Sequence, residues 1–567
     1  MKRNRLQLNV VLACALAALT IAVFAPVRDF TFLNYDDNVY VTDNPHVRAG
    51  LSAGNAAWSL TAFEAGNWHP LTLLSHMLDV SAFGLDAGKH HAVNLVLHVV
   101  NVLLLFWLLA WSTSQPWPSA FVAAAFAVHP LNVQTVAWIS ERKSLVSTAF
   151  WLAALLAFVK YRREDDRRAH VLVVVCAALA LAAKPMAVTL PLTLVLLDIW
   201  PLATRPKGRG SLTLRYAREL APLIVLAGVC GVLTLAAQRG AEALQTATSY
   251  PWPMRLGNAV VSLAWYLKAM ISPSGLAVFY PHPMTTLGIA EVVVSGVAVI
   301  AIATLVVKRS RTFPMLATGW WWYVGTLLPV VGIIQVGSQA YADRYAYVPL
   351  IGIFVIVAWS AVRLAENAPA SWRRLLASAG AAWIVALALV ARAQLPYWHD
   401  SVSLFRRAVD VVPDNALAHN NLGTALVDRN EMAEALDHFQ KAVAIAPWDS
   451  DANSNMGNAL RSLGRPEEAA AAYTKAVEQS PNDATYHYNF ATALVDLNRF
   501  DEAVAQLEAA VKLDPGYTKA RLLFGTVLYR QGRKDDALSQ FREILRQNPA
   551  DDRAARAIKW IENGGTE

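Results

Sequence analysis

Long apolar runs fill residues 1–395 and determine what this part of the chain can fold into. The first run, LQLNVVLACALAALTIAVFA, follows the basic start MKRNR and has about the 20 residues that cross a bilayer as a helix. This length and the poor cleavage site VFAPV favour an uncleaved helix over a signal peptide. Further apolar runs lie at 92–111, 118–130, 144–159, 170–184, 186–200, 219–237, 285–307, 313–333, 346–364 and 375–394. Together the runs predict about eleven membrane spans.

Basic residues gather in the short loops on one side of these spans, which predicts that this side is cytoplasmic. The basic stretches are KRNR, 160–168, 205–218, 308–311 and 363–374. The opposite loops are long and aromatic, at 26–91, 129–143, 238–284 and 334–345. An odd number of spans then places the N-terminus inside and the C-terminal part outside. The stretch 257–272 is ambiguous, and we favour a re-entrant or interfacial helix because a full crossing would move KRSR outside.

The pattern changes to a period of 34 residues from about residue 397. A period of 34 with small residues at fixed offsets is the signature of tetratricopeptide repeats. Small residues let the two helices of a unit approach closely, and proline ends each unit. The repeating positions are Pro413, Pro447, Pro481, Pro515 and Pro549; Gly423, Gly457 and Gly525, with Ala491 in the remaining slot; Ala435, Ala469, Ala503 and Ala537; and Leu426, Leu460, Leu494 and Leu528.

These patterns predict an all-α protein in four parts. Residues 1–396 form a multi-span membrane domain, 397–415 a linking half-repeat, 416–549 four full repeats, and 550–567 a capping helix and tail. The half-repeat is inferred from Phe405, Ala408 and Pro413, which match only the second helix of a unit.

Composition agrees with a membrane protein. Hydrophobic residues make up 55% of the chain and charged residues only 16%, against about a quarter in soluble domains, and the mean hydropathy is +0.34. Because the net charge of +7 comes largely from loops between spans, the expected partner is a lipid bilayer and no nucleic acid. The three cysteines lie in apolar runs without a CxxC pair, which indicates neither a disulfide framework nor a cysteine zinc site.

Two adjacent carboxylates, Asp36 and Asp37, follow the first span in the stretch FLNYDDNVYV. Charges this close to a bilayer are costly unless they face water or a site. The turn-forming residues of a solvated loop would explain an isolated pair equally well. The same loop, 26–91, is rich in further titratable groups. These are Asp43, Glu64, Asp79 and Asp86, with His46, His69, His76, His90 and His91.

Six motifs extend this pattern along the chain. They are NWHPLTLLSHMLD (67–79), GKHHAVNLVLHVVNVLLLF (88–106), AVHPLNVQTVAWISERKSL (127–145), KPMAVTLPLTLVLLD (184–198), FYPHP (279–283) and QAYADRYAYVPLIG (339–352). In this order, ahead of a tetratricopeptide array, they resemble the transmembrane, tetratricopeptide-repeat-containing O-mannosyltransferases and their bacterial relatives, which have the GT-C glycosyltransferase fold. The resemblance covers nearly the whole chain. It implies an inverting enzyme that moves a mannose-like sugar from a polyprenyl phosphate to a hydroxyl, such as protein Ser or Thr, on the outer face.

The resemblance also implies acidic residues in the first outer loop, at the position of Asp36 and Asp37. A hydroxyl is a poor nucleophile, and a nearby carboxylate can take its proton as the new bond forms. Because adjacent side chains diverge, we expect only one of the two to be the base, and we favour Asp36. The other would position the acceptor or a metal.

The leaving group would be a lipid phosphate, which requires cations at the depth of the lipid headgroups. The expected phosphate-binding residues are Arg344 with its neighbour Tyr345, Arg142 and Lys184. Snorkelling to the membrane interface is the alternative, and it is the favoured one for Lys143. Arg142 has a further alternative, which is to pair with Glu141.

Other outer-loop residues are candidate acceptor or sugar contacts, namely Trp68, His69, Glu64 and His129. A tryptophan belt at the membrane interface explains Trp68, Trp138 and Trp398 equally well. The adjacent His90 and His91 lack the i, i+4 spacing of a helical metal site. We therefore assign no metal, although a divalent cation stays possible, and the lipid-linked sugar is the donor substrate.

Asparagines recur on the first helices of the repeats, at Asn420, Asn421, Asn453, Asn455 and Asn489. Amide side chains there can hold an extended peptide by paired hydrogen bonds, which predicts an acceptor protein as the partner of the repeats. Ordinary polar surface is the alternative interpretation.

Three functions are compatible with the sequence, and the glycosyltransferase leads. A non-catalytic scaffold, whose repeats assemble envelope proteins, is the alternative. A transporter is disfavoured because the charges gather at one membrane face and not at the midplane. The alanine-rich composition favours a bacterial inner membrane, with the N-terminus cytoplasmic and the repeats periplasmic, whereas in a eukaryote the same topology would face the endoplasmic reticulum lumen.

Overall fold

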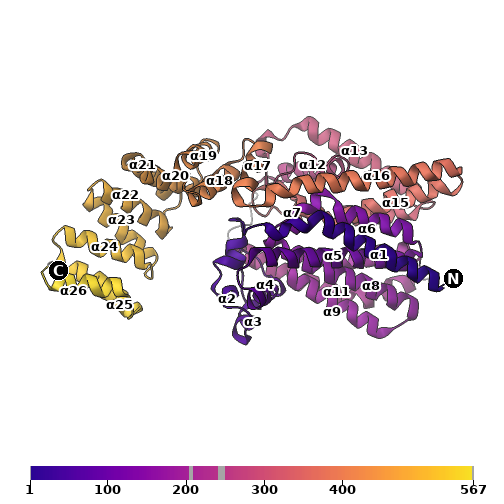
Figure 1. Ribbon diagram of the computed structural model, residues 1–567, viewed down its shortest axis with the longest axis horizontal. Helices are drawn as coiled ribbons and strands as arrows, with labels where there is room; N and C mark the ends of the chain where they lie inside the picture. Colours follow the sequence, from indigo (N-terminus) through magenta and orange to yellow (C-terminus); the bar gives the residue numbers. More distant parts are fainter. Residues whose placement is uncertain (1, 204–208, 241–248, 565–567) are drawn as a thin grey trace. The chain divides into compact units, whose positions relative to one another are not determined.

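The computed structural model describes residues 2–203, 209–240 and 249–564 (Figure 1). The chain forms two compact units, Met1–Val411 and Val412–Glu567, here called the membrane unit and the repeat unit. The helix α17 (Ser401–Val411) was expected to belong to the linking half-repeat. It lies within the membrane unit, where it packs on η8 (Leu395–Trp398). Parts of two expected loops, 205–208 and 241–248, lie outside the described residues.

Seven helices within the described residues are long and apolar enough to cross a membrane. They are α1 (Lys2–Phe24), α5 (Ala87–Thr113), α8 (Arg142–Glu164), α11 (Arg209–Gly240), α13 (Ile289–Arg309), α15 (Pro349–Glu366) and α16 (Ala370–Gln394). The pair α6 (Pro116–Val128) and α7 (Val133–Ala137), bent by 53°, raises this number to eight if it counts as one span. The chain is thus a multi-pass helical membrane protein.

The predicted number of about eleven spans is too high for the described residues, although every predicted run contains a helix. Four of the runs form the shorter helices α6, α9 (Arg167–Ala183), α10 (Leu190–Ile199) and α14 (Pro314–Leu327), of 13, 17, 10 and 14 residues. At about 1.5 Å per residue, such helices fall short of the roughly 30 Å hydrocarbon core. Prolines that open helices or follow them, such as Pro130 and Pro185, limit their length.

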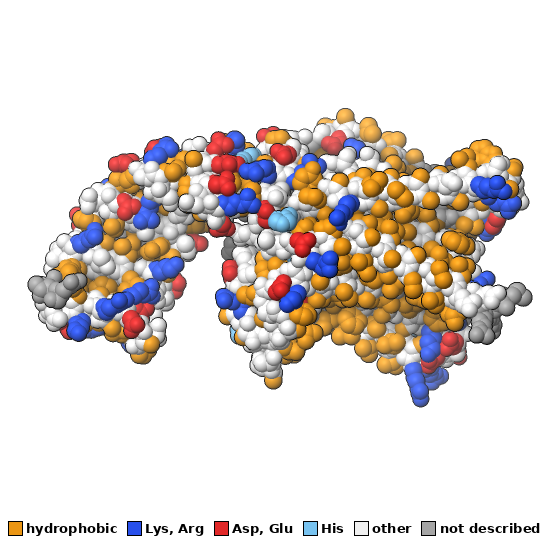
Figure 2. All heavy atoms as spheres, in the orientation of Figure 1, with side chains coloured by type: hydrophobic (Ala, Val, Ile, Leu, Met, Phe, Trp, Pro, Cys, Tyr) orange, Lys and Arg blue, Asp and Glu red, His pale blue; other side chains and the backbone are white. Residues whose placement is uncertain are grey.

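The long helices of the membrane unit lie side by side (Figure 1), with α8 packed between α5 and α9 and α14 packed on α15. Hydrophobic side chains cover much of the visible face of this unit in Figure 2, and charged side chains gather toward the ends of its helices. A surface of this kind suits a bilayer, in which the hydrocarbon core excludes charge.

Ion pairs and hydrogen bonds identify the two ends of the bundle. At one end, here called the basic end, Arg162 on α8 pairs with Asp198 on α10 and Glu219 on α11, and Arg163 donates to the Ser112 carbonyl on α5. At the other end, here called the DD end, the loop that holds Asp36 meets the first residues of α8.

A short antiparallel ladder joins two of the loops, with β1 (Tyr280–Pro281) against β2 (Gln339–Tyr341). The helix α12 (Trp252–Ile271) is fastened to the second loop, because Asn258 Nδ2 donates to the Ala340 carbonyl at 2.9 Å. This helix covers the ambiguous stretch 257–272 and is not among the described helices that meet the criteria for a span.

Four helix pairs and a final helix make up the repeat unit. The pairs are α18 (Ala416–Asp428) with α19 (Met432–Ile445), α20 (Ser450–Ser462) with α21 (Pro466–Gln479), α22 (Ala484–Asp496) with α23 (Phe500–Leu513), and α24 (Thr518–Arg530) with α25 (Lys534–Gln547); α26 (Asp552–Glu562) follows. Asn415, Asp449 and Asp483 cap three first helices at the same repeat position. The unit is a tetratricopeptide α-solenoid.

The glycines of the repeat period lie against aromatic rings. A Cβ at Gly457 would be 2.6 Å from the Tyr473 ring, and Gly423 and Gly525 face Phe439 and Phe541 at the same distance. The third repeat replaces both partners, with Ala491 and Leu507 buried in one core. In the third repeat alanine takes the place of glycine, and leucine takes the place of the aromatic ring that faces it. The smaller partner makes room for the alanine methyl group, as close packing requires.

We predict that Gly457→Ala loosens the second repeat. Alanine favours a helix by about 1 kcal/mol, but the clash with the Tyr473 ring costs about 1–3 kcal/mol. Hydrogen exchange of α20 and α21 in the full-length protein should therefore become faster. The double variant Gly457→Ala/Tyr473→Leu, which copies the third repeat, should regain most of the protection; unchanged exchange in the single variant would contradict the packing argument.

Candidate active site

The DD loop, residues 31–43, has an unusual backbone at the two carboxylates. Asp36 has φ +64°, in the left-handed region that few residues other than glycine adopt. A single π-helical turn, η2 (Asn38–Thr42), follows immediately. Tyr40 and Val41 of this turn are buried in a small core that includes Ile139. Backbone conformations of this kind concentrate at functional sites, where the surrounding structure holds them.

Asp37 fastens the DD loop to the residues that precede α8. Its carboxylate accepts hydrogen bonds from Ser140 N at 2.9 Å, Ser140 Oγ at 2.5 Å and Leu33 N at 2.9 Å. Trp138 adds a second link, because its indole N–H donates to the Tyr35 carbonyl at 2.9 Å and its ring stacks on the Tyr35 ring at 5.0 Å. Asp37 is fully buried, and the hydrogen bonds from Ser140 hold the DD loop against the segment before α8.

Asp36 faces the other way, as expected for adjacent residues. Its side chain is 36% exposed, and Oδ2 lies 3.8 Å from Lys143 Nζ. Lys143 itself is only 8% exposed and lies over the Tyr40 ring at 4.8 Å. The expected snorkelling of Lys143 to the membrane interface is therefore wrong, because its ammonium is held between Asp36 and Glu141.

Three cations surround the buried carboxylate of Glu141, and we call them the cation cluster. Lys184 Nζ lies 3.1 Å from Glu141, Arg344 Nε 3.5 Å and Lys143 Nζ 3.8 Å. Ser144 also donates to Glu141 and accepts from Lys184 at 2.6 Å. Thus α8, the end of α9 and η7 (Asp343–Ala346) meet at a single anion.

The cation cluster carries more positive than negative charge. Lys143, Lys184 and Arg344 face Glu141 and Asp36, which leaves an excess of one positive charge when all five are ionised. Among the described residues, Arg344 Nη1 is buried without a hydrogen-bond acceptor. A small cavity of about 30 Å³ adjoins Lys184 and Arg344 and is otherwise lined by Ser144, Ser147, Thr148, Trp151, Met186, Ala187, Thr189, Thr326, Tyr347 and Val348. An unpaired guanidinium N–H beside a cavity can bind an anion.

Arg142 does not join this cluster. Its guanidinium pairs with Asp79 at 2.7 Å and donates to Ser75 Oγ at 3.0 Å, to the His90 carbonyl at 2.9 Å and to Asn94. Both interpretations from the sequence, phosphate binding and a pair with Glu141, are therefore corrected. The reason is geometric, because successive residues at the start of a helix point about 100° apart.

Only some of the residues expected to contact the phosphate or the sugar lie near the cation cluster. Tyr345 lies beside Arg344, with its ring 5.0 Å from the guanidinium. His69 is buried next to the Tyr40 ring, and within the described part of the chain both its ring nitrogens lack hydrogen-bond partners. Burial, together with the nearby Lys143 and Lys184 cations, holds the pKa of His69 well below its usual range.

Three other candidates are not placed in the cation cluster by any contact among the described residues. His129 has a structural role, since Nε2 donates to the Met270 carbonyl and Nδ1 accepts from Leu131 N. Trp68 donates to the Leu60 carbonyl. Glu64 is half-buried, and its backbone pairs with Asn67.

The repeat asparagines fall into two groups. Asn455 donates to Asn420 at 3.0 Å and Asn489 donates to Ser454 at 3.1 Å, so these side chains link successive repeats; Asn421 is also half-buried. Asn453 differs, because it is fully buried and donates to the Pro447 carbonyl. His419, His487 and Arg521 make the same bond to the repeat prolines Pro413, Pro481 and Pro515. Asn453 therefore stabilises its own repeat and is not available to a peptide.

The sequence did not identify Glu141, Ser140 or the group His76, Asp79 and His90 as parts of a site. Side chains of the last three converge from two helices, which the spacing within one helix does not reveal. Glu141 carries a signal that was open to interpretation, since SERKS places one carboxylate beside two cations at the start of an apolar run.

Comparisons with known proteins find tetratricopeptide repeats in the C-terminal part of the chain. A family model described as a tetratricopeptide repeat matches residues 385–450, 454–517 and 488–553. The solved structure of YrrB, described as a tetratricopeptide protein with an unusual peptide-binding site, is 25% identical; the match covers 28% of this chain and 82% of YrrB with a TM-score of 0.26. A MamA structure is 18% identical, with 28% and 86% covered and a TM-score of 0.26.

Several relatives that match this chain are named protein O-mannosyl-transferases. TMTC4 of Homo sapiens is 24% identical over 74% of this chain and 64% of its own, and TMTC3 of Mus musculus is 24% identical over 66% and 44%. Tmtc1 of Drosophila melanogaster is 30% identical, over 29% of this chain and 20% of its own length. The chain thus spans less than two thirds of the length of these relatives. The expected resemblance to tetratricopeptide-containing O-mannosyl-transferases is confirmed.

We predict that Asp37 makes stability depend on pH. Burial raises its pKa from 3.8 to about 7, against the hydrogen bonds from Ser140 and Leu33, which lower it. Since the folded-state pKa lies above the unfolded value, the stability that Asp37 contributes is complete below about pH 4 and is lost as the pH rises to about 7.

The test compares thermal midpoints of the wild type and Asp37→Asn between pH 5 and pH 8. The difference, wild type minus variant, should be most favourable to the wild type at pH 5 and should fall toward pH 8. Parallel pH profiles for the two proteins would contradict a shifted carboxyl at this position.

Proposed function

We propose that this protein is a membrane glycosyltransferase that moves a mannose-like sugar from a polyprenyl-phosphate donor to a hydroxyl of an acceptor protein. The relatives named O-mannosyl-transferases support the class of reaction. The observation that carries the proposal is the cation cluster beside an exposed carboxylate at the DD end.

The cation cluster suits the phosphate of the donor. A phosphodiester between lipid and sugar carries one negative charge, which matches the excess of one positive charge that the three cations keep over Glu141 and Asp36. The unpaired Arg344 Nη1 would donate to a phosphate oxygen, and Lys184 would add a point charge. Both residues adjoin the same cavity, and Tyr345 supports the Arg344 side chain.

Asp36 suits the general base because it alone of the two carboxylates reaches solvent. It would take the proton of the acceptor hydroxyl while the hydroxyl oxygen attacks the anomeric carbon. The bond from that carbon to the phosphate oxygen breaks in the same displacement, which inverts the anomeric centre. The lipid phosphate leaves with the electron pair, and Lys184 and Arg344 stabilise its charge. His69, whose ring nitrogens have no hydrogen-bond partner among the described residues, would contact the sugar or acceptor.

The repeat unit would present the acceptor protein. Asn420, Asn421, Asn455 and Asn489 lie on the first helices of the repeats and keep partly exposed amides for a peptide backbone. In the proposed orientation the N-terminus is cytoplasmic, and the DD end and the repeats face the periplasm of a bacterial inner membrane. Lysines and arginines at the basic end support this orientation.

We predict that Asp36→Asn lowers sugar transfer by at least about 100-fold, because a positioned base contributes about 10²–10⁴-fold. The assay uses purified full-length protein in nanodiscs, polyprenyl-phosphate mannose and a Ser/Thr-rich peptide. Asp43→Asn is the matched control, since Asp43 is exposed in the same loop and lies outside the cluster. Full activity in Asp36→Asn would reject the base, and a wild type without any transfer would favour the non-catalytic scaffold.

We predict that Lys184→Gln weakens use of the donor. Loss of a charged hydrogen bond costs about 1.5–3 kcal/mol, so kcat/KM for the lipid donor should fall at least tenfold while KM for the peptide stays the same. Lys89→Gln provides the control because Lys89 is exposed and pairs only with Asp86 among the described residues. An equal loss for donor and peptide would argue against a phosphate contact.

A further inference from the structure

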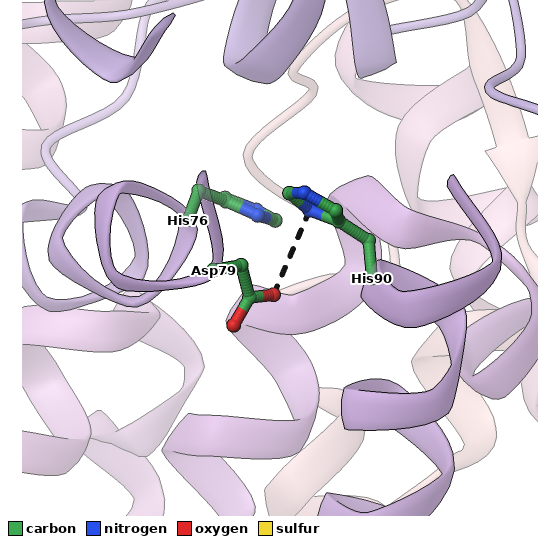
Figure 3. Close-up of side chains that lie close together, drawn as sticks. All are labelled: His76, Asp79 and His90. Carbon is green, nitrogen blue, oxygen red and sulfur yellow. Dashed lines mark ion pairs between the residues drawn. The ribbon is translucent and has the colours of Figure 1, made fainter. Parts of the chain in front are cut away.

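A second buried polar group lies where α4 (Pro70–Phe83) meets the start of α5. His76 and Asp79 are three residues apart on α4 and so share a face, and His90 comes from the first turns of α5. One ligand atom of each lies within 4.8 Å of the others. Figure 3 shows the two imidazole rings facing each other above the Asp79 carboxylate.

All three side chains are buried, and three of the four imidazole nitrogens lack hydrogen-bond partners among the described residues. Across the part of the chain that the structure describes, both ring nitrogens of His76 lack a hydrogen-bond partner, and so does Nδ1 of His90. A buried polar atom left unpaired costs about 1–3 kcal/mol. Unpaired imidazole nitrogens that converge on one place indicate a ligand that accepts nitrogen lone pairs.

His90 has the tautomer that a metal ligand needs. Its Nε2 lies 3.0 Å from the Gly84 carbonyl and therefore carries the proton, which leaves the lone pair on Nδ1. Nδ1 lies 3.6 Å from Asp79 Oδ2, too far for a hydrogen bond. That separation is close to the roughly 3.3 Å between ligand atoms around tetrahedral zinc.

We propose that His76, Asp79 and His90 bind a divalent transition-metal ion of the zinc class. Two imidazole nitrogens with one carboxylate oxygen favour such an ion, whereas magnesium and calcium prefer oxygen ligands alone. The site is separate from the cation cluster and does not depend on the proposed sugar transfer.

The ion pair between Asp79 and Arg142, at 2.7 Å, is the competing explanation for this group. It accounts for the carboxylate but leaves three imidazole nitrogens, both of His76 and Nδ1 of His90, without hydrogen-bond partners in the described part of the chain. A ligating carboxylate usually has a second partner of this kind, which orients it toward the metal. Arg142 is also the first residue of α8 and follows Glu141. The metal would therefore join α4 to α5 directly, and to α8 through the Asp79–Arg142 pair.

The test measures zinc bound to the full-length protein, purified with a tag that contains no histidine. The protein is treated with a chelator, loaded with Zn²⁺, desalted and analysed by inductively coupled plasma mass spectrometry. Wild type should hold close to one zinc per chain, and Zn²⁺ should raise its thermal midpoint. His76→Gln and His90→Gln should lose both effects. His91→Gln is the matched control, because this buried neighbour lies outside the group and should keep the zinc.

A wild type that binds no zinc would overturn the proposal and leave the Asp79–Arg142 pair as the whole explanation. Zinc retained by both histidine variants would overturn it as well. If the variants do not fold, zinc X-ray absorption of the wild type decides the question. Two imidazoles with an oxygen ligand would support the site, and sulfur ligands or oxygen ligands alone would overturn it.

Discussion

The burial of the Glu141 carboxylate is the constraint on which the DD end depends. A buried charge is stable only if it is paired and hydrogen-bonded, and Glu141 finds its partners on three separate segments. Lys143 follows it on α8, Lys184 ends α9, and Arg344 lies in η7. The pairing therefore fixes elements that are up to about 200 residues apart in sequence at one point. Loss of this anion would leave three cations in mutual repulsion.

The residues around Glu141 extend this constraint in different directions. Ser140 binds Asp37 and so holds the DD loop, Arg142 binds Asp79 on α4, and Lys143 faces Asp36. Four successive residues can do this because a helical start turns each side chain about 100° from the previous one. One short segment thus organises the loop, α4 and the cations, and any shift of α8 would disturb the carboxylates and the cations together.

This geometry explains what could be read from the sequence. Local patterns were sufficient for the apolar helices, the 34-residue repeats and the divergence of Asp36 and Asp37. They failed for Arg142, because adjacent charges suggested one cluster where the helix separates them. His76 and His90 meet only through tertiary packing, so spacing within one helix could not find them. The excess of predicted spans has a similar cause, since hydropathy does not show where proline-bounded helices end.

The cation cluster also links folding to the proposed chemistry. Glu141 balances only part of the surrounding positive charge, and the guanidinium of Arg344 keeps one buried N–H without an acceptor in the described part of the chain. A cluster with no excess charge would be more stable but would not attract a phosphate. The single positive charge left over is thus a cost to the fold that the proposed anionic donor would remove on binding. Since Asp36 borders the same cations, the attacking hydroxyl and the leaving phosphate would be aligned across Lys143 by interactions that already hold the protein together.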